Sequence, residues 1–280
     1  MPILRSTTLR ALALALLALG VGPILSWAIL VSPHAVFIDS RTRTGQVYLI
    51  NTGTTAEEVD VELRFGFPET DSTGEPTIRM MDQPGPEFPS AAGWIFAYPR
   101  RAVVQPGRRQ VVRLLAQPPA DLPPGEYWSR LIVTSRGAEV AVSGADSTVR
   151  AGVSLIVQTI SSVSYRNGDV STGVTLDDYR ADVQGDSIVA WVGLTRQGNA
   201  AYLGTIWIRL RNAQNRVVAE WDTPIAAYYR IHRRLAFAVD SVAAGRYAAE
   251  LEVTTARSDL PQSNILPAQT MRQVTQVEKR

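Results

Sequence analysis

Side chains that could carry chemistry are few in this chain of 280 residues. It holds two histidines, His34 and His232, and no cysteine, so disulfides, thiolate metal sites and a cysteine nucleophile are excluded. Asp177 and Asp178 could join a calcium site or be solvated turn residues, and no spacing of His, Asp and Glu resembles a metal-ligand set. The sequence has no glycine-rich phosphate loop and no Gly-x-Ser-x-Gly elbow. We therefore expect no enzyme, no cofactor and no metal; a hydrolase would require the fold to bring His232 to a serine and an acid.

The charge balance and the N-terminus restrict partners and location. Of 28 basic residues, Arg5 and Arg10 lie in a leader, so the remainder has as many basic as acidic residues, 26 of each, and nucleic-acid binding is not expected. Residues 1–28 have the order of a secretory signal, with positive charge, an apolar run and small residues. The alternative is an uncleaved anchor. We predict a protein of the periplasm or cell envelope, with no membrane span in the mature chain.

The elements that would position any site are strands. Beyond residue 30 the apolar residues recur with a period of two, which is typical of strands, and no sustained helical period occurs. The strands expected in the first half are 46–51, 59–65, 94–98, 110–116, 127–134, 139–143 and 149–160. Those expected in the second half are 188–195, 205–211, 217–221, 232–239 and 247–254. Each set is close to the count of an immunoglobulin-like sandwich.

The predicted fold is all-β, with two immunoglobulin-like β-sandwich domains in tandem after the signal peptide. The domains are expected at 29–162 and 163–256, followed by a polar tail at 257–280 that frays. A Gly-x-Tyr sequence leads into a late strand of each half, at Tyr127 and again 120 residues later at Tyr247. Such a tyrosine commonly donates its hydroxyl to the backbone of the preceding turn, so both tyrosines are interpreted as structural.

Two further segments are long enough to have a binding role. The connection 66–92 contains five prolines and five acidic residues without a ligand pattern, and is predicted to be mobile. The segment 149–160 places Val149, Val153, Leu155 and Val157 on one side. It is either the last strand of a sandwich, facing its own core, or an edge that pairs with a strand of a partner protein.

A run of motifs resembles the N-terminal domain of periplasmic pilus-assembly chaperones. It consists of Phe96-Ala97-Tyr98-Pro99, Val103-Val104-Gln105-Pro106-Gly107, Gln110-Val111-Val112-Arg113-Leu114 and Leu122-Pro123. The start is similar as well, in Val31-Ser32, Ala35-Val36-Phe37 and Val47-x-Leu49-x-Asn51. The likeness covers residues 31–165, whereas the second half is similar only as a generic sandwich.

The resemblance implies a protein that binds and caps a secreted or fimbrial subunit by β-strand addition. In that family the last strand of the first domain is lent to the subunit, which implies Val149, Val153, Leu155 and Val157 as partner-binding residues. The family anchors the subunit's C-terminal carboxylate with an Arg and a Lys, but this sequence has His34 and Ser161 there. His34 is either a partial substitute or an ordinary strand-end histidine.

The resemblance also implies an interdomain ion pair between Arg113 and Glu126; the alternative is two separate surface charges. The implied partners are a pilin-like or other secreted subunit and an outer-membrane usher. The alternative function is a non-catalytic structural or adhesive module of the bacterial cell envelope, in which no strand is lent.

Overall fold

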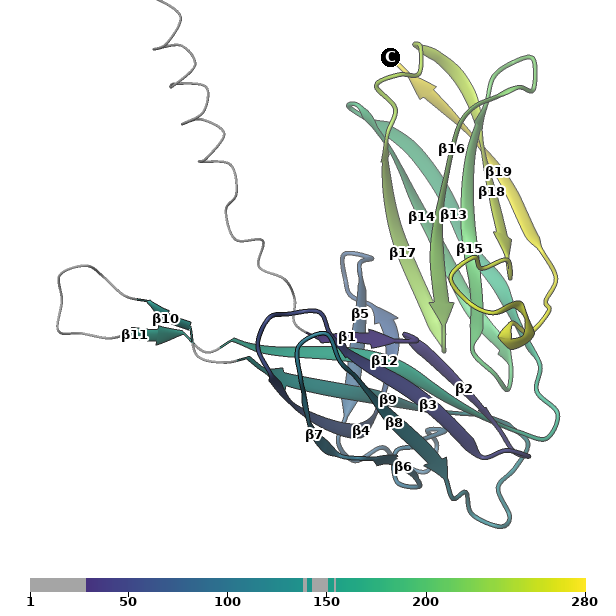
Figure 1. The fold of residues 1–280 in the computed structure, drawn as a ribbon. Coiled ribbons are helices and arrows are strands. Elements are labelled where there is room, and N and C mark those ends of the chain that lie inside the picture. Colours follow the sequence, from purple (N-terminus) through teal and green to yellow (C-terminus); the bar gives the residue numbers. More distant parts are fainter. Residues whose placement is uncertain (1–28, 138–139, 143–150, 154) are drawn as a thin grey trace, which may run out of the picture.

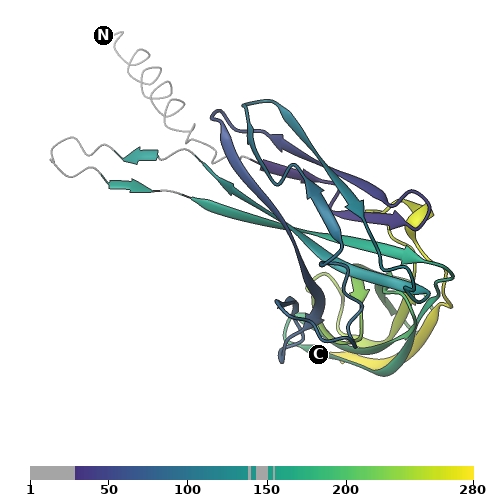
Figure 2. The same ribbon diagram turned by 90° about the horizontal axis from the view of Figure 1, so that it is seen from below.

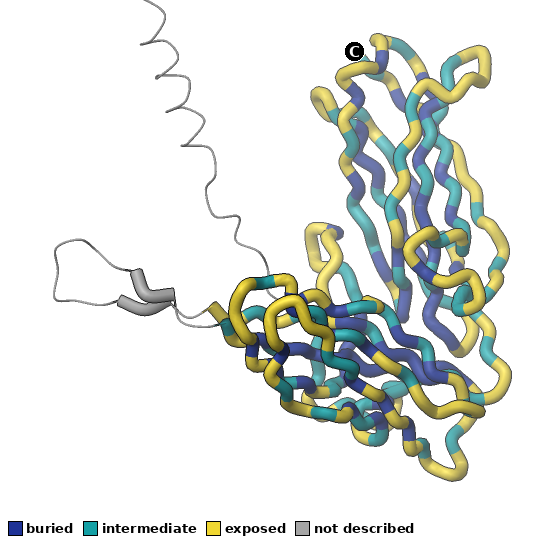
Figure 3. The backbone as a smooth tube through the Cα atoms, in the orientation of Figure 1, coloured by how far each residue is buried: buried dark blue, intermediate teal, exposed yellow. Residues whose placement is uncertain are grey.

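The computed structural model describes residues 29–137, 140–142, 151–153 and 155–280 of the chain. These residues form two β-sandwiches set against each other as an L (Figure 1). Each sandwich buries its own apolar core, visible as the dark blue stretches along the strands (Figure 3). The expected all-β fold of two tandem sandwich domains is confirmed. In the described residues no helix is long and apolar enough to cross a membrane.

The first sandwich consists of two sheets. One sheet has the strand order β1 (Ile29–Ser32), β3 (Thr44–Asn51), β8 (Arg109–Ala116) and β6 (Ile95–Tyr98). The other has the order β2 (Ala35–Asp39), β12 (Ile156–Asn167), β9 (Gly125–Arg136), β4 (Glu57–Thr70) and β5 (Pro76–Met81), with β7 (Arg101–Val104) also paired to β4. The first strand of the chain thus changes sheet at Pro33, since β1 pairs with β3 and β2 runs parallel to β12.

The core of the first sandwich follows from the period of two. Val47, Leu49, Val112 and Leu114 of one sheet face Leu131 and other inward residues of the opposite sheet, and all of these are fully buried. Beyond the body of the domain, the hairpin of β9 and β12 continues through β10 (Val140–Val142) and β11 (Ala151–Val153), which project away from both sandwiches (Figure 2).

The second sandwich also has two sheets. The smaller has the order β13 (Thr172–Gln184), β14 (Ser187–Gly198) and β17 (Arg230–Ala238), and the larger has β16 (Val217–Ala227), β15 (Tyr202–Arg211), β18 (Gly245–Thr254) and β19 (Met271–Lys279). A single 3-10 turn, η1 (Gln262–Asn264), precedes β19. The last strand of the first sandwich ends at Asn167 and β13 begins at Thr172, so the junction lies after residue 167, beyond the expected 162.

The two tyrosines predicted to be structural are confirmed in that role. The Tyr127 hydroxyl donates to the Pro123 carbonyl at 3.0 Å, and the Tyr247 hydroxyl donates to the Ala243 carbonyl at 2.8 Å. Each bond reaches back four residues to the turn before the strand, and the two sandwiches therefore use the same corner.

The prediction of a mobile connection at 66–92 is wrong for its first part. Strand β4 continues to Thr70 and pairs with β5 in an antiparallel hairpin, with Pro68 opposite Ile78. Proline is tolerated here because β5 is an edge strand and Pro76 begins it, so few ladder bonds need the missing N–H.

The prediction that the polar tail 257–280 frays is also wrong. Strand β19 pairs with β18 along its whole length and buries Val277 in the core. The Lys279 ammonium donates to the Val239, Asp240 and Val242 carbonyls, which fixes the end of the strand. The sequence did not predict this strand because Val274 lies on its outer face and the polar Gln273 and Thr275 lie on the same face as Val277, so its apolar alternation is weak.

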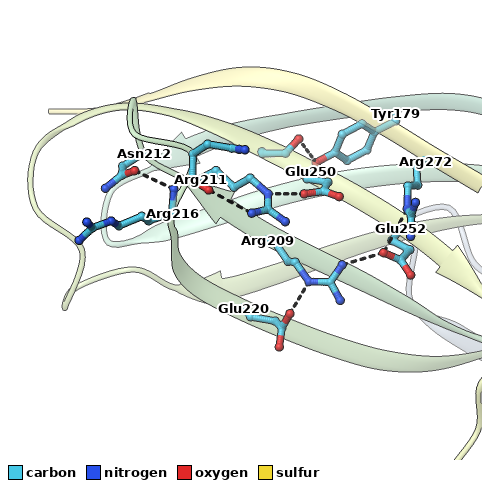
Figure 4. Close-up of polar contacts among 11 residues, drawn as sticks. Tyr179, Arg209, Arg211, Asn212, Arg216, Glu220, Glu250, Glu252 and Arg272 are labelled. Carbon is cyan, nitrogen blue, oxygen red and sulfur yellow. Dashed lines mark hydrogen bonds and ion pairs between the residues drawn. The ribbon is translucent and has the colours of Figure 1, made fainter.

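Charged side chains cover the outer face of this sheet in a row across all four strands (Figure 4). Arg209 of β15 pairs with Glu220 of β16 and with Glu252 of β18, which in turn accepts from Arg272 of β19. Burial would raise the pKa of Glu252, but the hydrogen bonds from Arg209 and Arg272 outweigh it and lower the pKa. The row ties the C-terminal strand to the sheet.

A pair of variants tests whether β19 is part of the second sandwich. Val277→Asp would place an unpaired carboxylate in the core and should lower the melting temperature of that sandwich by about 10 °C or more. Val274→Asp on the exposed face of the same strand is the control and should shift it by no more than about 2 °C. Circular dichroism against temperature measures both, and equal shifts would contradict the strand.

Candidate partner-binding site

Strand β12 has a free backbone edge along its first half. It pairs antiparallel with β9 over its whole length, from Ile156 opposite Arg136 to Asn167 opposite Gly125. On its other side β2 pairs with it only from Ser162 onward. Within the described residues no strand covers this side of 156–160, so the backbone N–H and C=O groups there are available to another chain.

The same segment exposes apolar side chains. Leu155 and Ile156 are 59% and 58% exposed and Ile160 is 39% exposed, whereas Val163 and Tyr165 farther along are fully buried in the core. By the period of two, Leu155 and Val157 continue the face that Val163 and Tyr165 present to the core. The inward face of β12 therefore continues from the core through Thr159 and Ser161 to the apolar Leu155 and Val157 at the open edge.

The predicted partner-binding residues fall on this edge in part. Leu155 and Val157 lie at the beginning of β12, exposed and half-buried respectively. Val153 lies in β11, and Val149 lies outside the described residues. Ile156 and Ile160 lie on the opposite face of the strand and were not predicted to bind, because the prediction rested on the apolar residues of one side alone.

An aromatic cluster joins the two sandwiches. Phe67 of β4 and Trp128 of β9 come from the first sandwich, and Tyr228 and Tyr229 come from the turn between β16 and β17. The ring centroids of Trp128 and Tyr228 are 4.5 Å apart and those of Phe67 and Tyr229 are 4.8 Å apart, both edge to face. This contact fixes how the domains meet.

Glu126 lies fully buried beside that cluster. It accepts from the Arg166 guanidinium at 2.8 Å and from the Trp128 indole at 2.9 Å, and the Ala201 N–H of the second sandwich reaches it at 3.3 Å. Its own N–H donates to the Asn199 carbonyl of the second sandwich at 3.0 Å. One buried carboxylate is thus bonded by groups of both domains.

The structure does not contain the predicted ion pair of Arg113 with Glu126. Glu126 is interdomain, as expected, but its partner is Arg166 of β12. Arg113 lies in the other sheet of the first sandwich, exposed on β8 opposite Gln46 and Tyr98. Strands β9 and β12 pair so that Glu126 lies opposite Arg166. A prediction of that strand register would have identified the ion pair.

His34 meets the second sandwich. Its Nε2 atom is 3.3 Å from the Asp259 carboxylate, which also accepts two hydrogen bonds from Arg257, at 2.6 and 2.5 Å. Hydrogen bonds from Arg257 lower the pKa of Asp259 to about 2, against the opposing effect of burial. The His34 ring therefore faces a carboxylate of its own chain, and Ser161, which is buried on β12, carries no charge.

The remaining candidates for chemistry do not converge. The Nε2 atom of His232 lies 3.4 Å from the Asp178 carboxylate, and the backbone N–H of His232 donates to the Thr70 hydroxyl. In the described contacts no serine is placed beside the ring. Asp177 accepts from Thr195 and Arg230. Among the described residues no three His, Asp or Glu side chains gather where a metal ion could be held.

Comparison with known proteins gave matches of structure only. No protein-family model matches the chain, and no curated protein sequence matches it. The YadV chaperone is similar with a TM-score of 0.46 and 12% identity, over 89% of this chain and 100% of the other. A chain of the CsuC–CsuE chaperone–tip adhesion subunit complex from Acinetobacter baumannii has a TM-score of 0.43 and 14% identity, over 89% and 97%. The Escherichia coli chaperone DraB has 0.41 and 12%, over 90% and 96%.

These likenesses concern the fold.

Replacement of the buried carboxylate tests the interdomain bond. Glu126→Gln leaves the Arg166 guanidinium, 15% exposed, without its counter-ion and should lower the free energy of unfolding by about 3 kcal/mol. Glu62→Gln, whose carboxylate is 56% exposed, is the control and should change it by less than about 0.5 kcal/mol. Urea unfolding followed by tryptophan fluorescence measures both, and equal values would refute a buried pair.

The Asp259 carboxyl gives a pH dependence whose sign follows from its pKa. Because the pKa is lowered on folding, its contribution to stability is present above the ordinary value of 3.8 and is lost as the pH falls toward about 2. Asp259→Asn should therefore be less stable than the parent at neutral pH, and the difference should shrink in urea titrations below pH 3.8. A difference that stays constant down to the lowest pH would contradict the pair with Arg257.

Proposed function

We propose that this protein binds a secreted or fimbrial subunit that lacks one strand of its own sandwich and caps it by strand addition. The observation that carries the proposal is the free edge of β12 between Ile156 and Ile160, together with its exposed apolar side chains. The sequence resemblance to pilus-assembly chaperones supports the same role.

Strand addition would use the backbone and the side chains differently. A strand of the subunit would take up the free N–H and C=O groups of β12, which supplies affinity without regard to sequence. Leu155 and Val157 would enter the groove that the missing strand leaves in the subunit. Burial of each such side chain is worth about 1.5 to 3 kcal/mol, and the alternation with polar neighbours fixes the register.

The rigid junction of the domains supports this role. The Glu126 site and the aromatic cluster hold the second sandwich close to the far half of β12, whereas the free half runs away from the second sandwich toward β10 and β11 (Figure 1). The second sandwich therefore leaves the free half of β12 uncovered. Capping in this way needs no nucleotide, because the exposed core of the subunit is shielded by contacts that form on binding.

The place of action is part of the proposal. We infer that residues 1–28 direct export, that the protein works in the periplasm or cell envelope, and that an outer-membrane usher receives the capped subunit. The polar outer faces of the second sandwich fit a protein that stays in solution after export.

A charge in the apolar row tests strand addition. Leu155→Glu should weaken binding of a strand-lacking pilin-like subunit by at least about 100-fold, because a carboxylate would be buried in an apolar groove. Val218→Glu is the matched control, since Val218 is 43% exposed on the second sandwich, and it should leave the affinity unchanged. Affinity is measured by surface plasmon resonance with the purified subunit.

Two results would contradict the proposal. One is undiminished binding by a Leu155→Glu protein whose circular dichroism matches the parent. The other is equal binding of a subunit whose missing strand has been supplied by fusion, since such a subunit has no open groove.

A further inference from the structure

The hairpin of β4 and β5 reaches out of the first sandwich to the second. Its turn meets β17, which is an edge strand of the smaller sheet there. The His232 N–H donates to the Thr70 hydroxyl at 2.9 Å, and the Arg234 N–H donates to the Gly74 carbonyl at 3.1 Å. Two alternate N–H groups of the free edge of β17 are thus occupied by a segment from the other domain.

Only glycine fits at the point of contact. Gly74 has φ of +88°, in the left-handed region. A Cβ atom there would lie 2.6 Å from the Arg234 nitrogen and 2.7 Å from the Arg234 Cβ atom, closer than such atoms approach in proteins. The turn and β17 therefore touch backbone to backbone, and any side chain at position 74 would push them apart.

Charge and aromatic contacts back the two hydrogen bonds. Burial lowers the pKa of the Arg233 guanidinium on β17, and the opposing charge comes from Glu75 of the hairpin. At the base of the hairpin Phe67 packs edge to face on Tyr229, next to the start of β17. The hairpin is held to the second sandwich along its length, and its turn is itself ordered by Asp71, which accepts from the Thr73 and Glu75 N–H groups at 2.8 and 3.0 Å.

We propose that the β4–β5 hairpin is a strap that sets the angle between the two sandwiches. The chain passes between the domains only once, between Asn167 and Thr172, and a single covalent connection with one interface leaves a hinge. The strap adds a second attachment on the far side of the aromatic cluster, so rotation about the junction would have to break it. It also occupies two backbone N–H groups on the edge of β17.

The effect on a bound subunit rests on the proposed function, but the strap itself can be measured without any subunit. Because the sequence has no cysteine, Arg41→Cys and Arg246→Cys place one spin label on each sandwich and no other label attaches. Both positions are exposed. Double electron–electron resonance then gives the distribution of distances between the domains.

Gly74→Val in the doubly labelled protein should widen that distribution at least about twofold, with the circular dichroism of both sandwiches retained. Gly107→Val is the matched control, because Gly107 also has a positive φ, +66°, but no atom lies within 4 Å of its Cβ position. It should leave the distribution as in the parent. Glu75→Arg places a second positive charge near Arg233 without backbone strain and should also widen the distance distribution. This variant replaces Gly74→Val if Gly74→Val does not fold.

An unchanged distribution in a folded Gly74→Val or Glu75→Arg protein would overturn the strap. A wide distribution together with subunit binding that Leu155→Glu does not reduce would sustain the strap and refute strand addition. A wide distribution together with weaker subunit binding in Gly74→Val, and neither effect in Gly107→Val, would show that the strap supports the binding of a subunit by strand addition.

Discussion

Between Ser162 and Arg166 strand β12 is held by β9 on one side and by β2 on the other, whereas between Ile156 and Ile160 it has β9 alone. The difference arises because the first strand of the chain is divided at Pro33 into β1 and β2, which join opposite sheets. β2 is too short to cover the whole of β12. The inner half of β12 therefore closes the first core, and its outer half keeps unsatisfied backbone groups beside apolar side chains.

An edge of this kind is a liability for a single sandwich, since it invites pairing with any other strand. The second sandwich changes its surroundings. Glu126 and the aromatic cluster bring the second domain against the inner end of the same sheet, and the β4–β5 hairpin attaches it a second time at β17. Without cysteine, both arrangements depend on packing and on a few buried hydrogen bonds. The buried Glu126 is more informative about domain geometry than about stability, because a desolvated ion pair gains little net free energy.

Sequence patterns predicted strands where one face was apolar and the alternation unbroken, and failed where a local feature broke the alternation. Strand β13 shows the reason. Its register shifts between Leu176 and Asp178, so Leu176 faces the core in one phase and Tyr179 in the next, and no single period of two fits the segment. The prediction missed strand β19 for a different reason, since this edge strand exposes Val274 on its outer face and has polar residues beside the buried Val277, so no apolar alternation marks it.

Acting alone, the sequence determined the all-β class, the two corner tyrosines and the apolar row with Leu155 and Val157, because these depend on local period and on turns only a few residues long. The tertiary structure decided which residues meet across the domains. Arg166 became the partner of Glu126 through the register of β9 and β12, and Asp259 came to face His34 from more than two hundred residues away. Such meetings depend on how strands pair and how sandwiches dock, and no spacing along the chain encodes them. The open half of β12 is likewise a property of the sheet, since whether an amphipathic strand is an interior strand or an edge depends on the strands beside it.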